Sequence, residues 1–246
     1  MNAVAEAADR KGAYPLREAA RLAHMPTQTA GRWVRGYAYM HKGERRHSMA
    51  VPSLAEWSSA PGHVRSGAGP LLDFEQLLTL LLVKAFHSRG LSIQRIKKAA
   101  SKAEEAYGVE NPFVTRQFKS DGNKVFIDLD PKTSGRERQL INLLSDQHEF
   151  HAVVEPSLFR DVVFVGERAG QWWPLGRNHA VLVAPDRQSG APHVADTGVR
   201  TDVMADMVEA EGGGDAGRAA AADWFGLTPD QVDDAVRFEE WLQQPT

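Results

Sequence analysis

The spacing of apolar residues over the first forty positions predicts two short amphipathic helices. Apolar side chains recur every three or four residues in two successive segments. They are Leu16, Ala19, Ala20 and Ala23 in the first segment, and Ala30, Trp33, Val34 and Tyr37 in the second. Pro26 lies between them, and because proline cannot continue a helix but suits the opening of one, we expect the break there. The pattern indicates a helix-turn-helix.

The second helix carries a polar face separate from its apolar one. Gln28, Arg32 and Arg35 are spaced i, i+4 and i+7, and Thr29 lies beside them. Such a face can enter a DNA major groove. The alternative is an exposed polar face without a ligand, and we favour DNA contact because the helix has a partner helix at the right spacing within a basic part of the chain.

The residues that follow predict a basic hairpin. AYMHKGERRHSMAV reads as two short strands around Lys42 and Gly43. Four basic side chains gather at its tip, and we expect them to contact phosphates, although a charge run of this kind is often only solvated. They are Lys42, Arg45, Arg46 and His47.

Two further helices are predicted before the chain changes character. Residues 52–70 are rich in Pro, Ser and Gly and read as a connection that Leu54 and Trp57 could pin to the core. A helix then begins at Asp73, with Gln76 completing a capping box, and another begins at Ser92. The lysines of the last helix are expected to form a solvated face, namely Lys97, Lys98 and Lys102.

Strand patterns dominate the middle of the chain, and helices return after residue 200. Residues 113–129, 161–165 and 179–184 alternate as strands, with a helix expected between them in GRERQLINLLSDQ. VMADMVEA, DAGRAAAADWFG and PDQVDDAVRFEEWLQ read as helices, the last starting near Pro229. We therefore predict a mainly α fold with small β elements (α+β). The predicted domains are residues 1–107, 108–175 and 176–246.

Charge separates the two ends of the chain. The net charge of the 246 residues is −3, but residues 10–47 carry nine Lys and Arg against two acids, and residues 178–246 carry four Arg against thirteen acids. A basic N-terminal third suits a polyanion, whereas an acidic C-terminal third suits a protein partner.

The chemistry of known catalytic and metal sites is hard to find in this sequence. There is no cysteine, which removes disulfides, thiolate metal sites and a cysteine nucleophile. His148 and His151 have i, i+3 spacing without a third ligand, and GGGDAG at 212–217 follows a helical stretch instead of a strand, so it reads as a linker. We expect no catalytic residue, metal or cofactor. With no signal peptide or membrane span, a cytoplasmic protein is expected.

The first 107 residues resemble the MerR-type winged helix-turn-helix domain. The resemblance rests on YPLREAARLAHMPTQT, on the basic wing and on RGLSIQRIKK. It implies that the second helix and the wing bind DNA through Gln28, Thr29, Arg32 and Arg35 together with Lys42, Arg45, Arg46 and His47. Pro26, Gly31 and Arg32 depart from the family pattern.

The last seventy residues resemble domain-of-unknown-function family 433, which occurs in VapB-type antitoxins. The matching residues are Gly190, Pro192, Val194, Thr197, Leu227 and Val232. Antitoxins of this type pair with PIN-domain ribonuclease toxins. The resemblance implies that an arginine pairs with the acidic active site of the toxin, and the candidates are Arg200, Arg218 and Arg237. The acidic surface could instead meet basic RNA-binding residues of the toxin.

Two functional hypotheses follow. The first is an antitoxin that silences a PIN-domain ribonuclease and represses its own operon as a homodimer bound to operator DNA. The second is a MerR-like regulator that responds to a small molecule bound near Trp172 and Trp173. An enzyme has the least support.

Overall fold

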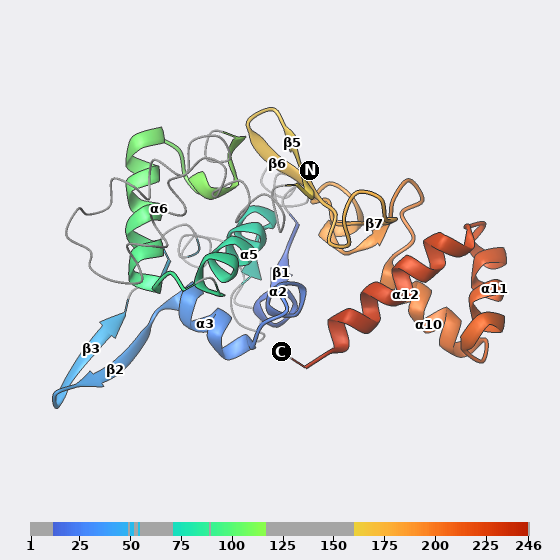
Figure 1. Ribbon diagram of the computed structural model, residues 1–246, viewed down its shortest axis with the longest axis horizontal. Coiled ribbons are helices and arrows are strands. Elements are labelled where there is room, and N and C mark those ends of the chain that lie inside the picture. The colour runs from blue at the N-terminus through green and yellow to red at the C-terminus, as the bar shows by residue number, and fades with distance from the viewer. Residues whose placement is uncertain are drawn as a thin grey trace, which may run out of the picture. The chain divides into compact units, whose positions relative to one another are not determined.

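The protein is described by a computed structural model that divides into two compact units (Figure 1). The described residues are 12–48, 50–51, 54, 71–88, 90–116 and 160–245. The first unit consists of the described parts of Tyr14–Arg160 and Phe164–Ala169, and the second of Asp161–Val163 and Gly170–Thr246 with residues 12–13. Helices and small two-stranded sheets make up both, as the predicted α+β class requires.

The first unit is built on two helix pairs and two small sheets. Its elements are β1 (Tyr14–Pro15), α2 (Leu16–Leu22), α3 (Thr27–Arg35), β2 (Tyr37–His41), β3 (Glu44–Ser48), β4 (Leu71–Leu72), α5 (Phe74–Ser88), α6 (Ile93–Tyr107) and the 3-10 turn η2 (Pro112–Val114). β1 pairs antiparallel with β4, which places Tyr14 opposite Leu72. This pairing brings the start of the unit beside the start of α5.

The core of the first unit follows the predicted apolar positions. Helix α5 is buried along most of its length, and Leu16 and Trp33 lie in the same unit's core with Leu54 from the connection. The predicted capping box is present, because the Gln76 backbone N–H donates to Asp73 Oδ1 at 2.8 Å and Asp73 N–H donates to Gln76 Oε1 at 3.1 Å. Ser92 occupies the N-cap of α6 as predicted, but its hydroxyl makes no capping hydrogen bond.

One predicted strand is wrong where it can be checked. Phe113 and Val114 were expected to begin a strand, but they lie in η2, which starts after Asn111 in the left-handed region at φ 52°. Pro112 lacks a backbone N–H and suits the first position of such a turn. Several other predictions fall outside the described residues. They concern residues 117–129, the helix expected in GRERQLINLLSDQ, and the side chains of His148, His151 and Trp57.

The second unit combines short strands with three helices. Its elements are η4 (Gln188–Gly190), β7 (Val181–Leu182) paired antiparallel with β8 (His193–Val194), and the helices α10 (Thr201–Ala210), α11 (Gly214–Phe225) and α12 (Pro229–Gln243). The strands β5 (Val162–Val165) and β6 (Arg168–Trp172) form a hairpin through which the division between the units runs. β5, β7 and the three helices lie where the sequence predicts them, whereas β6 and β8 fall in stretches for which no strand was predicted.

The three helices pack around one apolar cluster. Its buried members are Val194, Met204, Val208, Ala221, Val232, Ala235 and Val236. Helix α12 begins with a full capping box, since Gln231 N–H donates to Thr228 Oγ1 and Thr228 N–H donates to Gln231 Oε1 at 2.9 Å. The capping box therefore fixes the residue at which α12 begins.

The glycine-rich stretch 212–217 is not only a linker. Gly213 is the N-cap of α11 and Gly214 begins it. Gly217 is buried, and a Cβ placed on it would lie 2.3 Å from the backbone oxygen of Val208. The absence of a side chain here lets α11 approach α10 closely.

In the described parts of the chain, no helix is long and apolar enough to cross a membrane.

Candidate functional sites

The turn between α2 and α3 is held by a lysine from α5. Lys84 Nζ donates to the carbonyl oxygens of Ala23 at 2.9 Å and His24 at 2.8 Å. These are carbonyl groups at the end of α2, which its own backbone leaves unpaired. Partial burial lowers the pKa of Lys84. The turn that sets the angle of α3 is therefore fixed from a helix about sixty residues away in the chain.

Gly31 is buried in α3, between Leu16 of α2 and the end of the Arg35 side chain. A Cβ at Gly31 would be 3.4 Å from Leu16 Cδ2 and 2.9 Å from the end of the Arg35 side chain. The glycine thus permits close packing of α3 on α2. Its departure from the family pattern leaves the exposed face of α3 unchanged.

The exposed face of α3 carries the predicted DNA-binding residues. Gln28, Arg32 and Arg35 are exposed, and Thr29 is half-buried. Both arginines lie in the last turn of the helix, whose C-terminal dipole favours positive charge. Three long polar side chains therefore remain available on one side of α3, while Ala30, Trp33 and Val34 are buried on the other.

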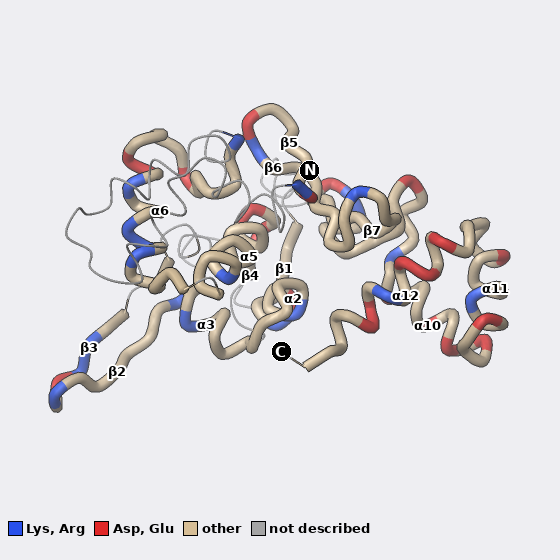
Figure 2. The backbone as a smooth tube through the Cα atoms, in the orientation of Figure 1, with Lys and Arg blue, Asp and Glu red and all other residues tan. Residues whose placement is uncertain are grey.

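The hairpin of β2 and β3 projects its basic residues into solvent (Figure 2). Its two-residue turn has φ of 52° at Lys42 and 83° at Gly43, the sign that a type I′ turn requires at both central positions. In the register of the strands, Tyr39 is opposite Arg46 and Met40 is opposite Arg45. Residues opposite each other share a face, so both faces of the hairpin combine a basic with an apolar side chain.

Two contacts connect the hairpin to the helices. The Arg32 guanidinium lies over the Tyr37 ring, 5.5 Å from its centroid. Lys97 of α6 donates to the Ser48 hydroxyl at 3.1 Å, and burial lowers the pKa of this lysine. Lys97 is therefore a bridge between α6 and β3, and the prediction that it belongs to a solvated face is wrong. Lys98 is exposed as predicted, and Lys102 is half-buried.

The second unit has the opposite charge. Figure 2 shows acidic residues along α10, α11 and α12. The first turns of all three helices contain an acid, respectively Asp202, Asp215 and Asp230. These positions favour negative charge through the helix dipole. The resulting surface would repel nucleic acid.

Each of the three candidate toxin-binding arginines has an acidic partner within the second unit. Arg200 donates through Nε and Nη2 to the Asp202 carboxylate, at 3.0 and 2.5 Å. Arg218 lies 3.0 Å from Asp233 and 3.9 Å from Glu240. Arg237 lies 3.7 Å from Asp234 and is the most exposed of the three, with 60% of its side chain accessible.

A pocket of about 310 Å³ lies beside the start of α12. Trp173 and His179 line it, and the His179 Nδ1 atom is 2.8 Å from Asp234 Oδ1. The second oxygen of Asp234 accepts from the Ala180 backbone N–H at 2.8 Å. The Trp173 Nε1 atom is buried without a hydrogen-bond partner. Trp172 is itself buried and does not line the pocket.

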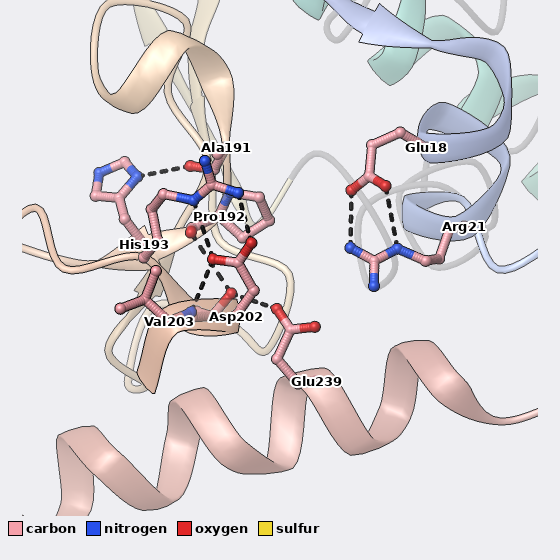
Figure 3. Close-up of polar contacts among 10 residues, drawn as sticks. Glu18, Arg21, Ala191, Pro192, His193, Asp202, Val203 and Glu239 are labelled. Carbon is pink, nitrogen blue, oxygen red and sulfur yellow. Dashed lines mark hydrogen bonds and ion pairs between the residues drawn. The ribbon is translucent and has the colours of Figure 1, made fainter. Parts of the chain in front are cut away.

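Three buried polar side chains lie near the start of α10 (Figure 3). The His193 ring is buried, its Nδ1 is 2.9 Å from the Ala191 carbonyl oxygen, and its Nε2 has no partner. Burial lowers the pKa of His193, although the Ala191 contact acts in the other direction. Thr201 donates to Glu239 Oε1 at 2.5 Å, and both side chains are buried.

Figure 3 also shows an ion pair within α2 of the first unit. Arg21 Nη2 lies 2.9 Å from Glu18 Oε1.

The titratable groups of the described residues do not gather into a metal site. No cluster of three or more His, Asp or Glu side chains with the geometry to hold a metal ion occurs among them.

Comparison with known proteins finds a similar curated sequence and a similar solved structure. The chain is 28% identical to the Mycobacterium tuberculosis protein named "Putative antitoxin VapB45" over 233 residues, which cover 91% of this chain and 92% of that protein. It also matches the crystal structure of Rv2018 from Mycobacterium tuberculosis with a TM-score of 0.64 and 21% identity, over 91% of this chain and 96% of that one. No protein-family profile matches.

The structural match shows that this chain and Rv2018 share a fold across nearly their whole length. The sequence match supports a relationship to antitoxins of the VapB type. Neither comparison tests the MerR-type or family 433 resemblance of the separate segments, which remain predictions, as do the three predicted domain ranges.

Proposed function

We propose that this protein is the antitoxin of a type II toxin-antitoxin system. In this proposal the first unit binds operator DNA and represses the operon, and the second unit binds and inhibits a PIN-domain ribonuclease toxin in the cytoplasm. Similarity to VapB45 over nine-tenths of both chains is the observation that carries the antitoxin role. The opposite charges of the two units support two different partners, a nucleic acid for the basic unit and a protein for the acidic unit.

The DNA-binding half is supported by the shape and charge of the first unit. Arg32 and Arg35 extend from the exposed face of a helix whose turn is fixed by Lys84. The hairpin adds Lys42, Arg45, Arg46 and His47, all exposed. We infer that α3 reads base edges in the major groove and that the hairpin contacts phosphates. A homodimer would place two such units on two half-sites of an operator.

Substitution of both α3 arginines tests this half. The DNA fragment upstream of the protein's own gene is the probe, and binding is measured at several salt concentrations. Because each base-reading arginine is worth about 1–3 kcal/mol, Arg32→Ala with Arg35→Ala should weaken binding by roughly 30-fold or more. Lys98→Ala, an exposed lysine of α6, is the matched control and should change affinity little. Equal affinity of the double variant and the wild type would contradict the assignment.

The toxin-binding half rests on the acidic helices and three arginines. We infer that the second unit covers the active site or the RNA-binding surface of the toxin. Arg200, Arg218 and Arg237 are the candidate contacts, and Arg237 is the most accessible of them. An arginine that reaches clustered carboxylates would pair with them and block metal binding.

Co-expression tests this half. The full chain should co-purify with the product of the neighbouring gene and relieve its toxicity, and Arg237→Ala should weaken the complex. Failure of the wild-type chain to bind or neutralise that product would contradict the antitoxin role.

A second function is favoured by the pocket near Trp173. A cavity of about 310 Å³ with an indole wall and the His179–Asp234 pair is large enough for a small effector molecule. A regulator of this kind would change its DNA affinity on binding the effector. Screening metabolites by thermal shift, with Trp173→Ala as the comparison, tests it. Stabilisation of the wild type alone, together with altered operator binding, would favour the regulator.

A further inference from the structure

The most exposed large apolar side chain in the described parts of the chain is Trp224, near the end of α11. It is 74% exposed. The other described tryptophans are buried or half-buried, and Trp33 and Trp172 are only 6% and 5% exposed. A single exposed aliphatic residue needs no explanation, but tryptophan is the residue most enriched among the side chains that dominate the affinity of protein interfaces.

The packing of the second unit gives Trp224 no structural task. Helix α11 is attached through earlier residues, with Gly217 against α10 and Ala221 in the apolar cluster. Its neighbour Phe225 packs against that cluster, whereas Trp224 does not. Ala216, Ala219 and Asp223 are also exposed, and Trp224 is much larger than any of them.

Charge indicates the kind of partner. Asp223 precedes Trp224, Asp230 follows in the first turn of α12, and both are exposed. The second unit as a whole is strongly acidic, as Figure 2 shows along its helices. DNA and anionic membranes would be repelled by this surface. An apolar pocket with a rim of Lys and Arg on a protein is complementary to it.

We propose that Trp224 is the anchor of the toxin interface, and that the acids beside it face the basic surface with which the toxin holds its RNA. This inference rests on the proposed antitoxin function. A ribonuclease must bind a polyanion, and so it presents the basic residues that Asp223 and Asp230 would meet. Covering that surface excludes RNA whether or not an arginine reaches the catalytic carboxylates.

The arginines of the second unit are consistent with this arrangement. Arg218 lies on α11 but is directed to Asp233 and Glu240 of α12, where it ties the two helices together. With that guanidinium paired inside the unit, Trp224 is the largest exposed side chain that α11 offers to a partner.

Substitution of Trp224 in the full-length chain tests the proposal. The probe is the purified product of the neighbouring gene, with binding measured by calorimetry and inhibition by its ribonuclease activity. Trp224→Ala should weaken binding by about 30-fold or more, as expected for a central aromatic anchor, and Trp224→Phe should recover much of the loss. Val203→Ala, a 45% exposed apolar residue of α10, is the matched control and should stay within about threefold of wild type.

The role of the acids beside Trp224 is tested separately, by the salt dependence of binding. The wild-type complex should weaken as salt rises from about 50 to 200 mM, and Asp223→Asn with Asp230→Asn should flatten that dependence. Circular dichroism checks that each variant is folded.

The outcomes separate the two ideas. If the wild type binds and inhibits but Trp224→Ala binds within threefold of it, the anchor is wrong and the antitoxin role stands. An unchanged salt dependence in the double Asp variant overturns the basic partner surface. If the wild type itself neither binds nor inhibits, the antitoxin role fails, and the anchor fails with it.

Discussion

Replacing Gly217 with alanine should destabilise the second unit, although alanine is the better helix former. The reason is the close crossing of α10 and α11. A Cβ at this position would lie 2.3 Å from the Val208 carbonyl oxygen and 3.2 Å from its carbonyl carbon. Both are backbone atoms, so they cannot turn aside as the end of a side chain can. The helices must separate, and this also loosens Val208 in the apolar cluster.

The magnitude follows from two opposing effects. Alanine in place of glycine inside a helix gains about 1 kcal/mol. Overpacking a well-packed contact costs about 1–3 kcal/mol, and contact with rigid backbone places this case near the upper end. We therefore expect a net loss of about 2 kcal/mol in the free energy of unfolding of the second unit. For a unit of this size the loss corresponds to a decrease in Tm of roughly 8–16 °C.

Urea unfolding of the full chain, followed by circular dichroism and limited proteolysis, measures this effect. Proteolysis identifies which transition belongs to the second unit. Ala219→Gly, at an exposed position of the same helix, should lose about 1 kcal/mol through helix propensity alone. If Gly217→Ala is as stable as the wild type or more stable, the close-packing argument is refuted.

Substitutions at three other positions probe polar side chains that form hydrogen bonds or lie buried within the units. Thr201→Val should cost about 1–3 kcal/mol of unfolding free energy, because the buried Glu239 loses a hydrogen bond, and the cost should shrink in a Glu239→Gln background in a double-mutant cycle. Lowering the pH below about 6.5 should destabilise the second unit, since the pKa of His193 is lower in the folded than in the unfolded chain, so acid protonates the unfolded form first. His193→Gln should remove that component of the dependence in unfolding curves taken from about pH 7 to pH 5, and an unchanged curve would contradict it. Lys84→Met should reduce the Tm of the first unit and weaken operator binding, because the α2 carbonyl groups lose their partner; a variant with wild-type Tm would show that the contact is dispensable.

Much of the fold could be predicted because its signals are local. The apolar spacing around Trp33, the turn at Lys42 and Gly43 and the capping box at Asp73 each depend on residues within one or two helical turns. The capping box at Thr228 has the same local signature, Thr-Pro-Asp-Gln, and could have been found in the same way.

Features that depend on distant partners could not be predicted from the same patterns. Nothing near Lys84 in the sequence indicates that it holds the end of α2, and nothing near Gly217 indicates that Val208 lies against it. The same holds at the candidate sites. Exposure of Arg32 and Arg35 follows from helix periodicity, whereas the pairing of Arg218 with acids of α12 depends on how two helices cross.

The lysine that holds the α2–α3 turn also bears on when the first unit can form during synthesis. Lys84 meets Ala23 and His24 across 61 and 60 positions of sequence, and β1 meets β4 across a similar separation. A nascent chain must extend past β4 before the strands can pair, and past residue 84 of α5 before the lysine can reach the turn. Closing so long a loop costs entropy that short-range contacts do not. An unfinished or clipped chain that ends before residue 84 therefore carries the residues of α3 without the support that orients them. Only chains extended past this point can hold the helix in place.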